Sequence, residues 1–146
     1  MGNGIFLNPG VGTYLESTFT PTVTLVGGAG NTVPVYSTNT GRYTRVGNKV
    51  FVNILLSGDG GAEGAGTGQL TIALPISSSA SQAAIDVPAG IGLNNATSSQ
   101  LYVTLAASSA TMSLKSYATD GTFAAYTGDS QNNATRSIGL SFSYEV

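Results

Sequence analysis

The fold is decided by a stretch in which apolar and polar residues alternate around a tight turn, RYTRVGNKVFVNILL at positions 42–56. Gly47 and Asn48 at its centre tolerate a positive φ, which the two-residue turn of a β-hairpin requires. A turn at this point pairs Val46 with Lys49, and that pair sets the register of everything beyond it. The sequence therefore predicts two antiparallel strands, one on each side of the turn.

The two faces of this predicted hairpin differ in composition. One face is nearly all apolar, and we assign it to the core; its members are Tyr43, Val50, Val52, Ile54 and Leu56. The opposite face is mixed, yet it carries Phe51 and Leu55. Either a second layer covers these two side chains or they contact another subunit, so both are candidate subunit-interface residues.

Similar alternation predicts further strands over 20–26, 32–38, 70–74, 82–87, 101–105, 112–117, 121–127 and 137–146. The segment 57–68 holds six glycines, which predicts a mobile loop. No segment shows a sustained helical period, and the strands recur at short intervals between Gly-, Ser- and Asn-rich turns. This spacing is typical of an all-β fold, and we predict an antiparallel β-sandwich or jelly roll.

The beginning of the chain differs from the rest. Residues 1–17 are rich in Gly and Asn and show no sustained period, which predicts an extended N-terminal arm followed by a β-sandwich domain over 18–146. Such an arm is ordered only where something outside the domain holds it. Its apolar residues Ile5, Phe6 and Leu7 are the candidates for docking it on a partner.

The composition excludes several kinds of function. The chain has 146 residues, of which 8% are charged and 41% hydrophobic, and it contains no His and no Cys. Thiol or Ser-His-Asp catalysis, an ordinary zinc site and disulfides are therefore excluded. Five basic residues cannot form a nucleic-acid footprint, and no apolar run is long enough to cross a membrane. The start of the chain also lacks the features of a signal peptide.

Few polar residues remain as candidates for chemistry. Asp59 and Glu63 offer carboxylates in the Gly-rich loop, but two are far fewer than the six to eight oxygen ligands that Ca²⁺ takes. No pair of carboxylates stands out as a glycosidase pair. The seven tyrosines, beside many Ser, Thr and Asn residues, suit either half-buried packing or adaptable binding of a sugar or protein. We therefore expect no catalytic residue, no metal and no cofactor.

Two stretches carry a resemblance to a known family. FTPTVTL at 19–25 and YSTNTGRYTRVGNKV at 36–50 resemble a β-sandwich module of tailed-bacteriophage virion proteins, in which a TPT(V/L) strand precedes a GRYT(R/K)(I/V)GN run. A Gly-rich segment, a strand ending in Leu74-Pro75 and a strand alternating with Ser at 137–146 follow in the family's order. The resemblance covers about residues 19–146, and the GRYTRVGN run is its most specific part.

The resemblance implies a non-enzymatic homotrimer in the virion, assembled in the host cytoplasm. Modules of this kind occur at the tips of trimeric tail fibres, and similar sandwiches are capsid decoration proteins. Fibre proteins usually carry a long attachment and shaft region, whereas Met1 lies only 18 residues before the module. We therefore expect a decoration (cement) protein bound to the major capsid protein or another virion protein. The alternative is the receptor-binding tip of a tail or head fibre that recognises a host surface glycan or protein.

Overall fold

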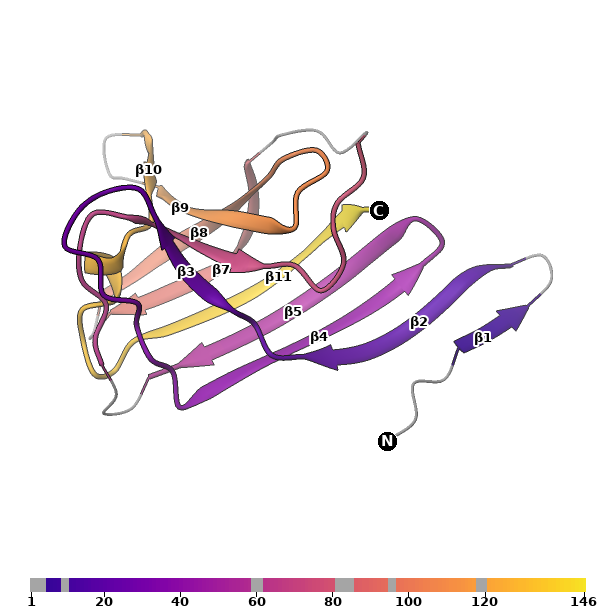
Figure 1. The fold of residues 1–146 in the computed structure, drawn as a ribbon, viewed down its shortest axis with the longest axis horizontal. Coiled ribbons are helices and arrows are strands. Elements are labelled where there is room, and N and C mark those ends of the chain that lie inside the picture. Colours follow the sequence, from indigo (N-terminus) through magenta and orange to yellow (C-terminus); the bar gives the residue numbers. More distant parts are fainter. Residues whose placement is uncertain (1–4, 9–10, 59–61, 81–85, 95–96, 118–120) are drawn as a thin grey trace.

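The computed structural model of the protein describes residues 5–8, 11–58, 62–80, 86–94, 97–117 and 121–146, and the side chains of these residues except at 5–8, 11–13, 86, 93–94 and 97–98. The described part is built from antiparallel strands and one short 3₁₀ helix, η1 (Gly128–Gln131). The strands are β1 (Ile5–Asn8), β2 (Val11–Phe19), β3 (Val23–Val26), β4 (Thr38–Val46), β5 (Lys49–Ser57), β6 (Gln69–Ala73), β7 (Asp86–Asn94), β8 (Thr97–Leu105), β9 (Thr111–Tyr117), β10 (Phe123–Ala125) and β11 (Ser137–Glu145) (Figure 1). The predicted all-β class is confirmed.

The hairpin predicted at the centre of the sequence is confirmed in detail. Strands β4 and β5 are joined at Gly47, whose φ is +61°, and Val46 pairs with Lys49. The side chains of β5 alternate strictly between buried and exposed positions up to Leu56. The last strand, β11, shows the same alternation, with Ile138, Leu140, Phe142 and Tyr144 buried.

All the strands belong to one hydrogen-bonded sheet, in the order β1-β2-β4-β5-β11-β7-β8-β9-β6-β3, with β10 beside β9. Each pair of neighbours is antiparallel. The all-β class predicted from the sequence is therefore confirmed, whereas the finer prediction of a β-sandwich or jelly roll is not confirmed by this single sheet. Alternation identifies the strands, whereas their partners depend on contacts distant in sequence.

The sheet must curl, because β2 and β3 are close in the chain and far apart in the sheet. Only residues 20–22 separate them, so the step from Phe19 to Val23 spans at most about 15 Å. In a flat sheet the eight strand spacings between β2 and β3 would measure roughly 38 Å. The link is held from both ends of the sheet: Asn39 Nδ2 donates to the Pro21 carbonyl at 2.9 Å, and the Ala73 amide donates to that of Thr22 at 2.9 Å.

The curled sheet encloses one hydrophobic core. Its centre is formed by inward-facing residues of five strands: Val50, Val52, Ile54, Leu56, Leu70, Ile72, Leu101, Val103, Leu105, Met112, Leu114, Ile138, Leu140, Phe142 and Tyr144. Tyr43, which we assigned to the same face, is partly buried against this cluster. The face assigned to the core from the sequence is therefore the face that the structure buries.

The N-terminal segment is part of the sheet rather than separate from it. Strands β1 and β2 form a hairpin, and β2 pairs with β4 from Tyr14 to Phe19, across the boundary expected between residues 17 and 18. The hairpin projects beyond the turn that joins β4 to β5 (Figure 1). Ile5, Phe6 and Leu7 lie in β1, but their side chains are outside the described part. Their role in docking stays a prediction.

Three further predictions differ from the structure. Residues 32–37 form an isolated bridge between Thr32 and Ala65 and no strand. The strand expected to end before Pro88 instead begins at Asp86 and passes Pro88 through an irregularity in its pairing with β8. Residues 82–85, the first part of the strand predicted over 82–87, lie outside the described residues.

The third difference concerns the loop predicted to be mobile. The described part of 57–68 is tied to other segments by hydrogen bonds. The Gly64 amide donates to the Gln131 carbonyl at 2.8 Å, and the Gly66 amide donates to Asp129 Oδ1 at 2.8 Å. Gly64 and Gly68 are buried. A side chain at either glycine would overlap neighbouring atoms, so these glycines permit close packing rather than motion.

Candidate interaction surface

The surface of β2, β4, β5, β11 and β7 that is turned away from the core is called the outer face below. Five of its apolar side chains are exposed: Tyr14, Val46, Phe51, Leu55 and Ile91. Phe51, Leu55 and Ile91 are about half exposed, at 46%, 51% and 56%. In the described part of the chain no second layer covers Phe51 or Leu55. Such a concentration of exposed apolar residues on one sheet face is typical of an interaction surface.

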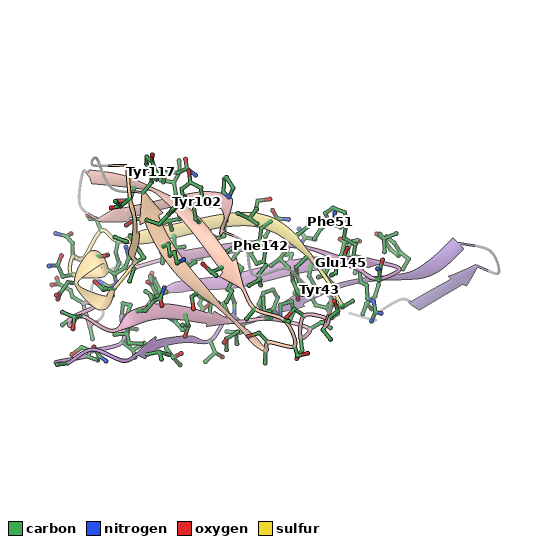
Figure 2. All side chains as sticks on the ribbon, turned by 90° about the horizontal axis from the view of Figure 1, so that it is seen from above. Tyr43, Phe51, Tyr102, Tyr117, Phe142 and Glu145 are labelled. Atoms are coloured by element: carbon green, nitrogen blue, oxygen red, sulfur yellow. The ribbon has the colours of Figure 1, made fainter. Side chains whose placement is uncertain are left out.

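Side-chain size on the outer face changes sharply between two neighbouring strands. The outward positions of β5 carry large side chains, which form a ridge: Lys49, Phe51, Asn53 and Leu55. The outward positions of β11 that pair with them carry smaller ones or none, which form a furrow: Glu145, Ser143, Ser141 and Gly139. Figure 2 shows Phe51 on the opposite side of the sheet from Tyr43, which faces the core.

The furrow is deepest at Gly139. This residue pairs with Leu55 on one side and with Ile91 on the other. The two exposed apolar side chains thus flank a position that has no side chain. The resulting groove has a volume of about 530 Å³ and also includes Arg42 and Asn53 along its wall. It is open and largely apolar.

The few charges on the outer face interact weakly with one another. Arg42 Nη2 lies 3.9 Å from Glu16 Oε1, and both side chains are well exposed. An exposed ion pair of this kind contributes little to stability. Tyr14 Oη donates to Glu16 Oε2 at 3.2 Å, and this hydrogen bond raises the pKa of Tyr14 above its usual range. Lys49 Nζ lies 6.0 Å from the centroid of the Phe51 ring.

A second exposed group lies on β8, β9 and β10, at the end of the molecule remote from the β1–β2 hairpin. The rings of Tyr102, Tyr117 and Phe123 form a triangle with centroid distances of 4.7, 5.4 and 6.3 Å. Tyr117 and Phe123 are about half exposed, and Figure 2 shows Tyr102 beside Tyr117. Aromatic rings on a polar surface suit the binding of a sugar or a protein, one of the two roles that the tyrosine content left open.

A buried arginine was not predicted from the sequence. Arg136 is fully buried, and its guanidinium donates to the carbonyls of Asn133 at 2.8 Å, Ala62 at 2.8 Å and Val35. Its guanidinium carbon lies 5.7 Å from the centre of the Tyr36 ring, within cation–π range. The side chain therefore ties together three segments that connect the strands at this end of the sheet, which is a structural role.

A partly buried tyrosine, Tyr36, and a buried one, Tyr126, share a glutamine next to this arginine. Tyr36 Oη donates to Gln131 Oε1 at 3.1 Å, and Gln131 Nε2 donates to Tyr126 Oη at 2.8 Å. Burial raises the pKa of Tyr126 to about 12 and that of Tyr36 even further. Both hydroxyls therefore stay neutral at any physiological pH, and the network holds the segment around η1 against the core.

The structure brings together no catalytic or metal-binding group among the residues that it describes. Asp59 lies outside those residues, and Glu63 is exposed. No three carboxylates gather where they could hold a metal ion in the described ranges. In the same ranges no helix has the length and hydrophobicity needed to span a membrane.

Comparisons with protein-family models, with curated proteins and with solved structures find no match to this chain.

Proposed function

We propose that the protein is a non-enzymatic structural component of a bacteriophage virion, a homotrimeric decoration protein that binds and stabilises the capsid shell. The observation that carries the proposal is the outer face of the sheet, where Phe51, Leu55 and Ile91 are about half exposed. The chain has few charges, and depletion of charge is characteristic of the centre of an interface. The sequence resemblance supplies the virion context.

The number of copies per particle tests this proposal. Quantitative mass spectrometry of purified particles, from the phage whose genome encodes the chain, should give on the order of hundreds of copies, because a decoration protein follows the symmetry of the shell. A few to a few dozen copies would indicate a fibre or spike instead. Absence of the chain from purified particles would refute a virion role of either kind.

Deletion of residues 1–10 tests the docking role of the N-terminal segment. The deletion removes β1 but keeps the pairing of β2 with β4, which starts at Tyr14. We expect a folded trimer that no longer coats particles. The assay adds the shortened protein to particles from which the decoration protein has been removed, and full-length protein added to the same particles is the control. Normal occupancy by the shortened protein would show that β1 does not dock.

A second candidate function is favoured by the aromatic triangle of Tyr102, Tyr117 and Phe123. As the tip of a tail or head fibre, the protein would recognise a host surface glycan or protein through these exposed rings. Purified protein would then bind host cells saturably, and Tyr117→Ala would reduce binding while Tyr14→Ala, on the outer face, would not. Lack of adsorption at high protein concentration would exclude this candidate.

A further inference from the structure

Gly139 is exceptional among the glycines whose surroundings the structure describes. Six of those glycines have positive φ, at positions 27, 28, 30, 47, 66 and 121. At seven others a side chain would overlap neighbouring atoms, at positions 41, 58, 64, 68, 90, 92 and 128. Gly139 has neither constraint, because its φ is not positive and a Cβ there would meet no atom within 4 Å.

Nothing in the described part of the protomer therefore compensates for the cost of this glycine. Gly in the middle of a strand is destabilising relative to Ala, since it loses more conformational freedom on folding. A glycine inside a strand often marks a place where a ligand or another chain approaches the backbone closely. Gly139 also lies at the floor of the groove between Leu55 and Ile91. Both observations point to an occupant from outside the protomer.

We propose that this occupant is a second copy of the chain, whose β5 ridge fits into the β11 furrow. The proposal rests on the homotrimer proposed above and names its contacts. If a rotation axis parallel to the strands relates the copies, a given residue lies at the same height along the axis in every copy. Residues that pair across β5 and β11 within one protomer then also face each other between protomers. Leu55 of one copy is placed over Gly139 of the next.

The other rows of the sheet are complementary in the same way. At the heights along the axis that follow Leu55 and Gly139, the contact places Asn53 of one copy opposite Ser141 of the next and Phe51 opposite Ser143. The last such pair is Lys49 opposite Glu145. Each row sets a larger side chain against a smaller one, and the last also sets opposite charges against each other. The matching holds for a threefold axis, because it depends only on the axis being parallel to the strands. A homotrimer built in this way buries Phe51 and Leu55 together.

The substitution Gly139→Val tests the contact between copies without disturbing the fold of the protomer. The added side chain enters open space in the protomer and lies between Leu55 and Ile91, so the fold should be retained. The same side chain fills the furrow that receives Leu55 of the next copy. We expect the concentration at which the oligomer dissociates to rise roughly tenfold or more, as overpacking of an interface predicts. Ala125→Val, which adds apolar bulk at an exposed position on β10, is the control.

Circular dichroism and urea unfolding report the fold of both variants, while sedimentation velocity and light scattering report assembly. An oligomer of Gly139→Val as tight as that of the unmodified chain would overturn the proposal. Loss of assembly by the Ala125→Val control alone would overturn it as well, because the interface would then lie on β10.

Cross-linking tests the pairing directly, because Leu55→Cys shortens the side chain that faces the thiol added by Gly139→Cys. The chain has no cysteine, so Leu55→Cys and Gly139→Cys each provide a single thiol, and a link between them must join two chains. Packed sheets lie about 10 Å apart, which a short bis-maleimide spans. Co-expressed Leu55→Cys and Gly139→Cys should give linked dimers on a denaturing gel. The combination of Gly139→Cys with Thr111→Cys, on the exposed side of β9, should not.

The outcomes distinguish this proposal from the homotrimer on which it rests. A trimer that cross-links as expected supports both. A trimer without the Leu55–Gly139 link refutes the ridge-and-furrow contact and leaves the trimer intact. A linked dimer supports the contact and refutes the trimer. An unmodified chain that is monomeric at all concentrations refutes both.

Discussion

Alkaline pH should destabilise this protein steeply, because two buried tyrosines and a partly buried one resist ionisation in the folded state. Burial is the main cause in each case, and it raises the pKa of Tyr126 and Tyr144 to about 12. The pKa of Tyr36 is raised further. Tyr144 Oη donates to the Ile76 carbonyl at 2.6 Å, and ionisation would remove this hydrogen bond. The protein should therefore keep these three protons well above the pH at which exposed tyrosines lose theirs.

The sign and the size of the effect follow from proton linkage. A tyrosine in the unfolded chain ionises near pH 10, so between about pH 10 and 12 the unfolded state binds fewer protons and the free energy of unfolding falls. The stabilisation is fully present below pH 10 and is lost as the pH rises through 12. A shift of two units corresponds to at most about 2.7 kcal/mol per tyrosine. Tyr126 and Tyr144 together would remove at most about 5 kcal/mol, a large part of the 5–15 kcal/mol typical of a domain.

The assay is urea unfolding, followed by circular dichroism at successive pH values from about 9 to 12, together with a tyrosinate absorbance titration. The absence of Trp and Cys makes the absorbance of the seven tyrosines easy to interpret. With three protons retained, the slope should approach about 4 kcal/mol per pH unit. Tyr144→Phe is the control and should make the slope shallower by about a third. An unfolding free energy that is unchanged between pH 9.5 and 11.5 would refute the reasoning, as would ionisation of all seven tyrosines near pH 10 with the fold intact.

Three substitutions test other parts of the structure, with the unfolding free energy as the readout. Gly47→Ala should cost about 1–2 kcal/mol, because φ is +61° in the hairpin turn; an unchanged value would mean that the turn relaxes. Leu101→Ala should cost about 2–5 kcal/mol, since Leu101 is fully buried, and a loss below 1 kcal/mol would place it outside the core. Tyr126→Phe removes the hydroxyl that accepts from Gln131 and should cost about 1 kcal/mol; a more stable variant would argue against that hydrogen bond.

Local pattern in the sequence predicted local structure well. The Gly47-Asn48 turn and the alternation around it determine the pairing of β4 with β5, because a two-residue turn leaves only one register. The buried residues of β11 could be predicted for the same reason, since their period of two is unbroken. Phe51 and Leu55 stood out as apolar residues on a polar face, and both lie exposed on the outer face.

Features that depend on distant contacts could not be predicted. Strands of similar alternation are interchangeable as partners, so the single curled sheet could not be told from a sandwich. The burial of Arg136 depends on carbonyls of Val35 and Ala62, far away in the chain, and nothing in its own neighbourhood indicates it. The sequence predicts a strand that ends before Pro88, which lacks an amide hydrogen, yet an irregularity in the pairing accommodates this residue inside β7.

The furrow at Gly139 belongs to the same class of feature. In the sequence this glycine is one more small residue in a strand that alternates with serine. Only the structure shows that its place is open and that Leu55 and Ile91 lie on either side of it.

The position of β11 has a consequence for biosynthesis. This strand is synthesised after all the other strands of the sheet, yet it lies between β5 and β7 in the middle of the sheet. Until β11 emerges, β5 and β7 each present an open strand edge to solvent, in addition to the outer edges of the sheet. Open strand edges favour pairing with other chains. The nascent protein thus cannot complete its sheet during translation of its first 136 residues, before β11 begins at Ser137. Slow release or a high density of ribosomes on the message would therefore favour aggregation, and chaperones that shield open strands would raise the yield of soluble protein.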